Sequence, residues 1–159
     1  MRFQFWLPFF LMIATVYGVR HEIRQDTNIN SVIQTAAAGD TLLILEHIIC
    51  KESVIINKNL CIMGFSEKSA SLSIMSGSYL ITGENIQSIE ICNIKLAAMG
   101  ILMEGLIRFD NIDSLFINNV TFLDAAFQGK ISNSFVKIVN SSFNYSKTKC
   151  LQLENIEGI

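Results

Sequence analysis

Asparagine recurs at nearly regular intervals from residue 59 onward, and this periodicity constrains the fold more than any other feature. One column has spacings of 26, 26, 22 and 22 residues and consists of Asn59, Asn85, Asn111, Asn133 and Asn155. A second column runs through the same units and consists of Asn93, Asn119 and Asn140. Because both columns keep the same order, they predict one structural unit repeated every 22–26 residues.

Alternating apolar residues precede the second column. The segments are Ile89-x-Ile91, Leu115-x-Ile117 and Val136-x-Ile138, each ending two residues before its asparagine. A period of two predicts short β-strands, and asparagine tolerates the left-handed backbone of a following turn. Such a short unit cannot bury its own apolar face, whereas stacked units share a continuous core. We therefore predict an all-β fold, a parallel β-helix with ladders of hydrogen-bonded asparagines.

The leucine-rich repeat is the main alternative, because its period overlaps with this one. Its pattern places asparagine at the ninth position, whereas counting from Ile86 or Ile112 places Asn93 or Asn119 at the eighth. The units also contain no amphipathic helical stretch. Both observations favour the β-helix.

Residues 19–40 are predicted to form a lead-in and a short capping helix ahead of the rungs, which span 41–159. Asn30 or Ser31 could cap this helix, and Gly39 is placed to end it. One helix face would cover the open end of the first coil, through Val32, Ile33 and Ala36.

The first 18 residues have the pattern of a secretory signal peptide. Arg2 precedes an apolar stretch, and Val16 and Gly18 suit a cleavage site before Val19. An uncleaved membrane anchor is the alternative, although Pro8 interrupts a run that is short for a bilayer core about 30 Å thick. We therefore expect a secreted or cell-surface protein.

Cysteines and glycosylation sequons agree with export. The sequons begin at Asn119, Asn140 and Asn144. Four cysteines could form disulfides in three connectivities or remain buried free thiols: Cys50, Cys61, Cys92 and Cys150. Because there is no Cys-x-x-Cys pair or Cys/His cluster, we expect no metal site and no cofactor.

The start of the predicted rungs carries a family resemblance. Residues 36–44 read AAAGDTLLI, and residues 52–64 read ESVIINKNLCIMG. Together they resemble the opening of pectin lyase-like right-handed β-helix proteins, which typically read A-x-x-G-D-T-I followed by E-x-V-x-I-x-K-x-L-x-L-x-G. The resemblance covers about residues 29–159. It implies a right-handed solenoid, but its motifs do not specify an activity.

The catalytic constellations of enzymes that resemble this chain are missing from the sequence. There is no Asp-Asp pair for glycoside hydrolysis, and both histidines precede the repeats. The nearest approach to a site is Arg108 with Asp110, which share one side of a strand. Asp113 is a third weak candidate, or the partner of Arg108 in a surface ion pair.

These observations predict a non-catalytic β-helix segment that presents a rigid face to glycans or surface proteins. A balance of 12 Lys+Arg against 14 Asp+Glu argues against nucleic acid as a partner. Residues 150–159 begin another rung and stop within it, so we expect a longer solenoid. Two alternatives stay open: the N-terminal part of a polysaccharide enzyme with catalytic rungs further on, and an adhesin-like repeat with a distal membrane anchor.

Overall fold

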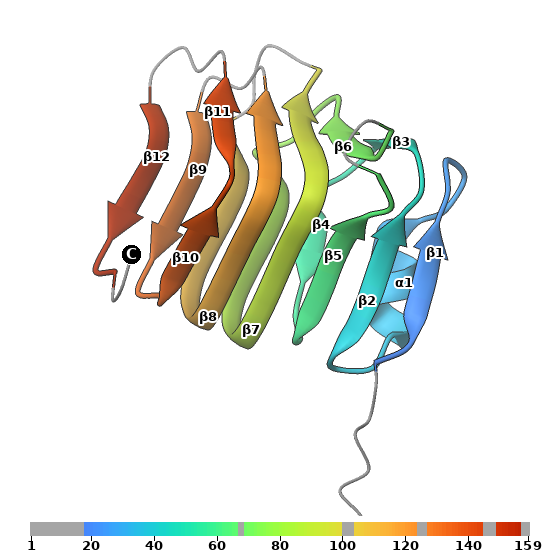
Figure 1. The fold of residues 1–159 in the computed structure, drawn as a ribbon, viewed down its shortest axis with the longest axis horizontal. Helices are drawn as coiled ribbons and strands as arrows, with labels where there is room; N and C mark the ends of the chain where they lie inside the picture. Colours follow the sequence, from blue (N-terminus) through green and yellow to red (C-terminus); the bar gives the residue numbers. More distant parts are fainter. Residues whose placement is uncertain (1–17, 67–68, 100–103, 124–126, 145–148, 157–159) are drawn as a thin grey trace, which may run out of the picture.

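The structure is a computed structural model that describes residues 18–66, 69–99, 104–123, 127–144 and 149–156. The predicted leader lies outside these residues, apart from Gly18. The chain forms a parallel β-solenoid of about five turns, with about 24 residues per turn. The prediction of an all-β parallel solenoid with one short N-terminal helix is therefore confirmed (Figure 1).

One 12-stranded sheet coils around the core, and every strand pair in the described residues is parallel. The elements are β1 (Arg20–Ile23), α1 (Ile29–Thr35), β2 (Asp40–Ile44), β3 (His47–Cys50), β4 (Val54–Ile56), β5 (Leu60–Gly64), β6 (Ser71–Ile74), β7 (Tyr79–Ala98), β8 (Gly105–Leu123), β9 (Phe127–Ser132), β10 (Val136–Val139), β11 (Ser142–Asn144) and β12 (Lys149–Glu154).

Strands β7 and β8 each bend around three sides of the coil, and the register between strands defines three lateral faces. The first face consists of β4, residues 79–84 and 105–110, β9 and β12. The second consists of β1, β2, β5, residues 86–92 and 112–118, and β10. The third consists of β3, β6, residues 94–98 and 120–123, and β11.

Asparagines with left-handed backbone mark the two corners of the second face. Seven have φ between 50° and 57°: Asn85, Asn93, Asn111, Asn119, Asn133, Asn140 and Asn155. Amide side chains bond directly along the stack from Asn111 to Asn85 (2.6 Å), from Asn119 to Asn93 (3.0 Å) and from Asn155 to Asn133 (3.1 Å). At the remaining steps, Asn133 bonds to Asp110 and Asn140 to Asn118.

Asn59 departs from the predicted first column. Its Oδ1 accepts a hydrogen bond from the backbone of Ser88, 29 residues away, and its Nδ2 donates to Gln87. Leu60 pairs with Ile89, which places Asn59 past the corner that Asn85 occupies. The step from β5 to β7 is therefore longer than the 26-residue step that follows, and the corner ladder does not include Asn59.

Replacing Asn111 by alanine is expected to lower the free energy of unfolding by about 1–2 kcal/mol, because alanine is disfavoured in left-handed backbone. Asn111 has φ 54° and an exposed side chain, so no cavity is created. Urea denaturation measures the change, with Asn111→Gly as the matched control, because glycine loses the amide but keeps access to this backbone. Equal losses in both variants would contradict the conformational explanation.

Inward-facing aliphatic side chains fill the solenoid, as the alternating pattern predicts. Stacked pairs such as Ile89 with Leu115 and Ile91 with Ile117 are fully buried. The phenylalanines do not form the single core column expected from their number. Phe109 and Phe122 are buried, and the Phe122 ring stacks on Phe143 at 4.6 Å. Phe116 points outward below Lys137, Phe135 is 48% exposed, and the side chain of Phe127 lies outside the described residues.

The capping helix begins two residues earlier than predicted. Asn28 caps it by accepting a hydrogen bond from the backbone of Ser31, and Ile29 and Ile33 are its buried residues. Asn30, an expected cap, instead binds Ser53 and the backbone N–H of Ile55 near β4. The helix therefore packs next to the first coils, with Ala36 also in the core.

Asp40 anchors the N-terminal segment to the first coil. Its carboxylate is 3% exposed and accepts hydrogen bonds from the backbone N–H groups of Val19 (2.7 Å) and Ala37 (2.8 Å). His21 Nε2 lies 2.7 Å from Oδ2 of this carboxylate. The hydrogen bond with His21, more than those with the backbone, lowers the pKa of Asp40 below its ordinary 3.8.

This pKa shift predicts an acid-sensitive contribution to stability. Because the folded-state pKa of Asp40 lies below that of the unfolded chain, the contribution is present above about pH 4 and is lost as pH falls through the folded-state pKa. We expect Asp40→Asn to lower the melting temperature at neutral pH and to flatten its fall in acid. The exposed Asp26→Asn is the control. Identical pH profiles for Asp40→Asn and the unmodified chain would refute this account.

Candidate functional site

The first face carries two outward-facing rows of polar side chains from successive coils. One row is Thr82, Arg108, Lys130 and Gln152, and the other is Glu84, Asp110, Ser132 and Glu154. Residues within a row come from neighbouring strands, so they are spaced by about 4.8 Å. We call these eight residues the polar rows.

Arg108 is the exposed cation of the polar rows. It borders a shallow depression that is also lined by Ile55, Thr82, Glu84 and Asp110. Lys130 lies next to it on the following coil and forms an ion pair with Glu154 at 3.3 Å. Among the described residues, Arg108 forms no ion pair, so its guanidinium is open to a ligand.

The structure brings Arg108 and Asp110 to one side of β8, as the sequence predicts, but separates Asp113 from them. Asp110 accepts hydrogen bonds from Ser132 Oγ and Asn133 Nδ2, both at 2.8 Å. These bonds lower the pKa of Asp110, so its carboxylate is an ionised structural acceptor, unsuited to general-acid chemistry. Asp113 lies beyond the corner at Asn111, on the second face.

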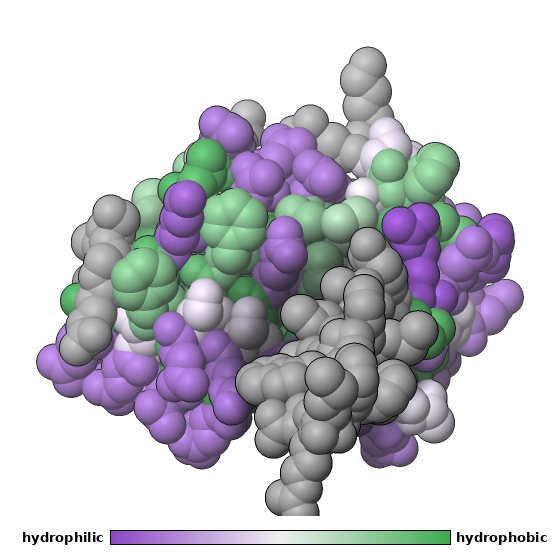
Figure 2. Space-filling model, turned by 60° about the horizontal axis from the view of Figure 1, so that its bottom comes forward, coloured by the Kyte–Doolittle hydropathy of each residue, from purple (hydrophilic) through white to green (hydrophobic). Residues whose placement is uncertain are grey.

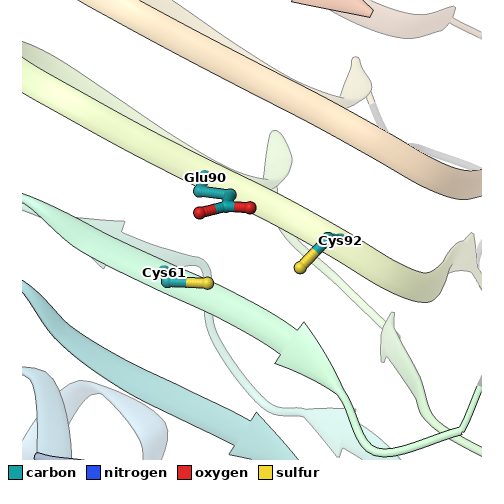
Figure 3. A group of neighbouring side chains, drawn as sticks. All are labelled: Cys61, Glu90 and Cys92. Atoms are coloured by element: carbon teal, nitrogen blue, oxygen red, sulfur yellow. The ribbon is translucent and has the colours of Figure 1, made fainter. Parts of the chain in front are cut away.

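A second cluster lies on the outer side of the second face and joins Cys61 of β5 to Glu90 and Cys92 of β7 (Figure 3). One donor atom from each residue lies within 4.8 Å of the others. All four cysteines are free thiols, with Cys50 buried and Cys150 exposed elsewhere. Burial raises the pKa of Cys50 to about 11, which makes that thiol a poor nucleophile.

The three sequon asparagines lie in different settings. Asn119 is partly buried, and its amide donates to Asn93 within the ladder. Asn140 lies at the equivalent corner, and its amide bonds to Asn118 at 3.4 Å. Asn144 is exposed at the end of β11, where its amide contacts only Ser142 among the described residues. Of the three, Asn144 is therefore the position where a glycan would interfere least with the stack.

The surface of the solenoid is chemically mixed. The side drawn in Figure 2 combines hydrophilic and hydrophobic residues. Exposed apolar side chains in the described residues include Ile55 and Phe135. No helix among the described residues is long and apolar enough to cross a membrane.

Comparison with known proteins gives no relative: no protein-family model, curated protein or solved structure matches the chain. The fold itself is established by the strand register, which gives a parallel β-solenoid.

Proposed function

We propose that this chain is a non-catalytic module of a secreted or cell-surface protein, built as a right-handed pectin lyase-like solenoid, that binds acidic glycans through its first face. The leader pattern and the sequons support export, and the opening motif supports the family. One observation carries the ligand class: Arg108 and Lys130 project side by side from neighbouring coils into the polar rows.

Acidic sugars fit this arrangement chemically. Arginine binds carboxylate and sulfate groups with two parallel hydrogen bonds, and an exposed guanidinium needs little rearrangement to do so. The ammonium of Lys130 adds a second cation one coil away. Threonine, serine and glutamine side chains in the polar rows supply hydroxyl and amide groups for sugar hydroxyls. Rigid backbone pairing on both sides holds these groups at fixed spacing, which reduces the entropy lost on binding.

A titration with oligogalacturonate and with a neutral oligosaccharide of equal length tests the proposal. We expect the acidic oligomer to bind more tightly, with an affinity that falls as salt rises. Arg108→Ala should weaken binding by about 10–100-fold, the worth of one charged hydrogen-bonded contact. Lys137→Ala, on the second face, is the matched control and should change little.

Two results would overturn the proposal. Failure of acidic oligosaccharides to bind, or equal binding by Arg108→Ala, would remove the ligand assignment. Release of shortened or unsaturated products, abolished by Arg108→Ala, would show that the face is catalytic.

A further inference from the structure

The cluster of Cys61, Glu90 and Cys92 lies apart from the polar rows and has no part in the proposed glycan binding. Its side chains project from two neighbouring strands of the second face and converge on a common point (Figure 3). Thiolate and carboxylate are ligands of borderline-soft divalent cations, above all Zn²⁺. The question is whether the spacing suits a metal ion or a disulfide.

The strand register decides against a disulfide between Cys61 and Cys92. Cys61 pairs with Glu90, whereas Cys92 pairs with Met63, so the two cysteines are diagonal neighbours. A strand separation of about 4.8 Å and a two-residue rise of about 6.6 Å place their Cα atoms about 8 Å apart. Disulfides need Cα atoms within about 7 Å, so a bond here requires movement of the backbone.

A metal ion bridges this diagonal more easily. Zinc–sulfur bonds of about 2.3 Å in a tetrahedral site separate two sulfur atoms by about 3.8 Å. The donor atoms of the cluster already lie within 4.8 Å of one another, so small side-chain rotations reach that geometry.

Neighbouring polar groups prepare the sulfur atoms for this role. A hydrogen bond links the two thiols and lowers the pKa of Cys92, while the pKa of Cys61 is raised by the same bond and by burial. Thr41, opposite Cys61 on β2, hydrogen-bonds to the Cys61 sulfur. A hydroxyl donor beside a thiolate is the kind of outer contact that orients a metal ligand.

We propose that Cys61, Cys92 and Glu90 bind one Zn²⁺ ion, with water in the fourth position. Both thiols release their protons as the ion binds, and no oxidation or reduction takes place. The ion would connect β5 to β7 at the long step where Asn59 leaves the corner ladder. It would therefore reinforce the stack where the asparagines do not.

Zinc titration of the full reduced chain, in competition with a chromophoric chelator and followed by native mass spectrometry, tests the proposal. We expect one zinc ion per chain and a higher melting temperature in its presence. Cys61→Ser, Cys92→Ser and Glu90→Gln should each weaken zinc binding at least about tenfold, since loss of even an outer contact has that effect. Cys50→Ser and Cys150→Ser are the matched controls and should bind as the unmodified chain does.

Circular dichroism of each variant separates loss of the site from loss of the fold, and Glu90→Gln keeps both thiols. Three outcomes would overturn the proposal. These are no zinc binding by the folded chain, undiminished binding by a folded Cys61→Ser/Cys92→Ser double variant, and a Cys61–Cys92 disulfide that forms with zinc present.

Discussion

Replacing Phe109 by alanine is expected to lower the free energy of unfolding by about 3–5 kcal/mol, the usual cost of truncating a buried phenylalanine. Phe109 is fully buried on the inner side of the first face, between Gly83 and Ile131 of the neighbouring coils. Backbone pairing on both sides limits how far these coils can collapse into the cavity. Because small domains are stable by only about 5–15 kcal/mol, this loss is a large fraction of the total.

Urea denaturation measures the effect, and two comparisons identify its cause. Phe135→Ala removes the same side chain from a position that is 48% exposed and should cost much less. A methyl group at Gly83 would lie 3.1 Å from the Phe109 ring. Gly83→Ala should therefore be tolerated better in the Phe109→Ala background than alone. Equal costs for the two phenylalanines would contradict the assignment of Phe109 to the core.

The second large effect is expected at Gly64, where alanine should cost about 3 kcal/mol or more, at the upper end of overpacking effects. An added Cβ would lie 2.0 Å from the backbone oxygen of Asn93 and 2.8 Å from Cβ of Ala70. The first contact is with main chain, so β5 would have to move away from β7. Such movement breaks the pairing that sets the register of the following coils.

Thermal and urea unfolding of Gly64→Ala measure this cost. Ser88→Ala, an exposed substitution on the neighbouring strand, is the control and should stay within about 0.5 kcal/mol of the unmodified chain. A stable Gly64→Ala variant with native spectra would show that β5 and β7 do not approach as closely as described.

Local sequence patterns predicted the regular part of the solenoid. Alternation at Ile89-x-Ile91 and Leu115-x-Ile117 gave the inward rows, and the left-handed asparagines lie at the corners that follow. Asn59 was misplaced because it has the same sequence spacing as its column but lies on a longer coil step. Spacing alone does not distinguish an asparagine at a corner from one shifted along the face.

The thiol cluster was missed for a related reason. Its ligands come from two coils, and sequence signatures of zinc sites rely on ligands that are close along the chain. Alignment of the alternating segments Leu60-x-Ile62 and Ile89-x-Ile91 would have placed Cys61 beside Glu90 on the outer side. The signal was therefore the register of the solenoid, combined with the side on which each residue lies. In the same way, Arg108 and Lys130 become neighbours only through stacking.

The coil register is the central claim, and cross-linking of Ser88→Cys with Ser114→Cys tests it most directly. These exposed residues pair across β7 and β8, with Cα atoms about 4.8 Å apart and within disulfide range. Mild oxidation followed by peptide mass mapping should show a bond between positions 88 and 114. The pair Ser88→Cys with Phe116→Cys is diagonal, at about 8 Å, and should remain unlinked. Linkage of the diagonal pair, with none between 88 and 114, would contradict the register and the solenoid built on it.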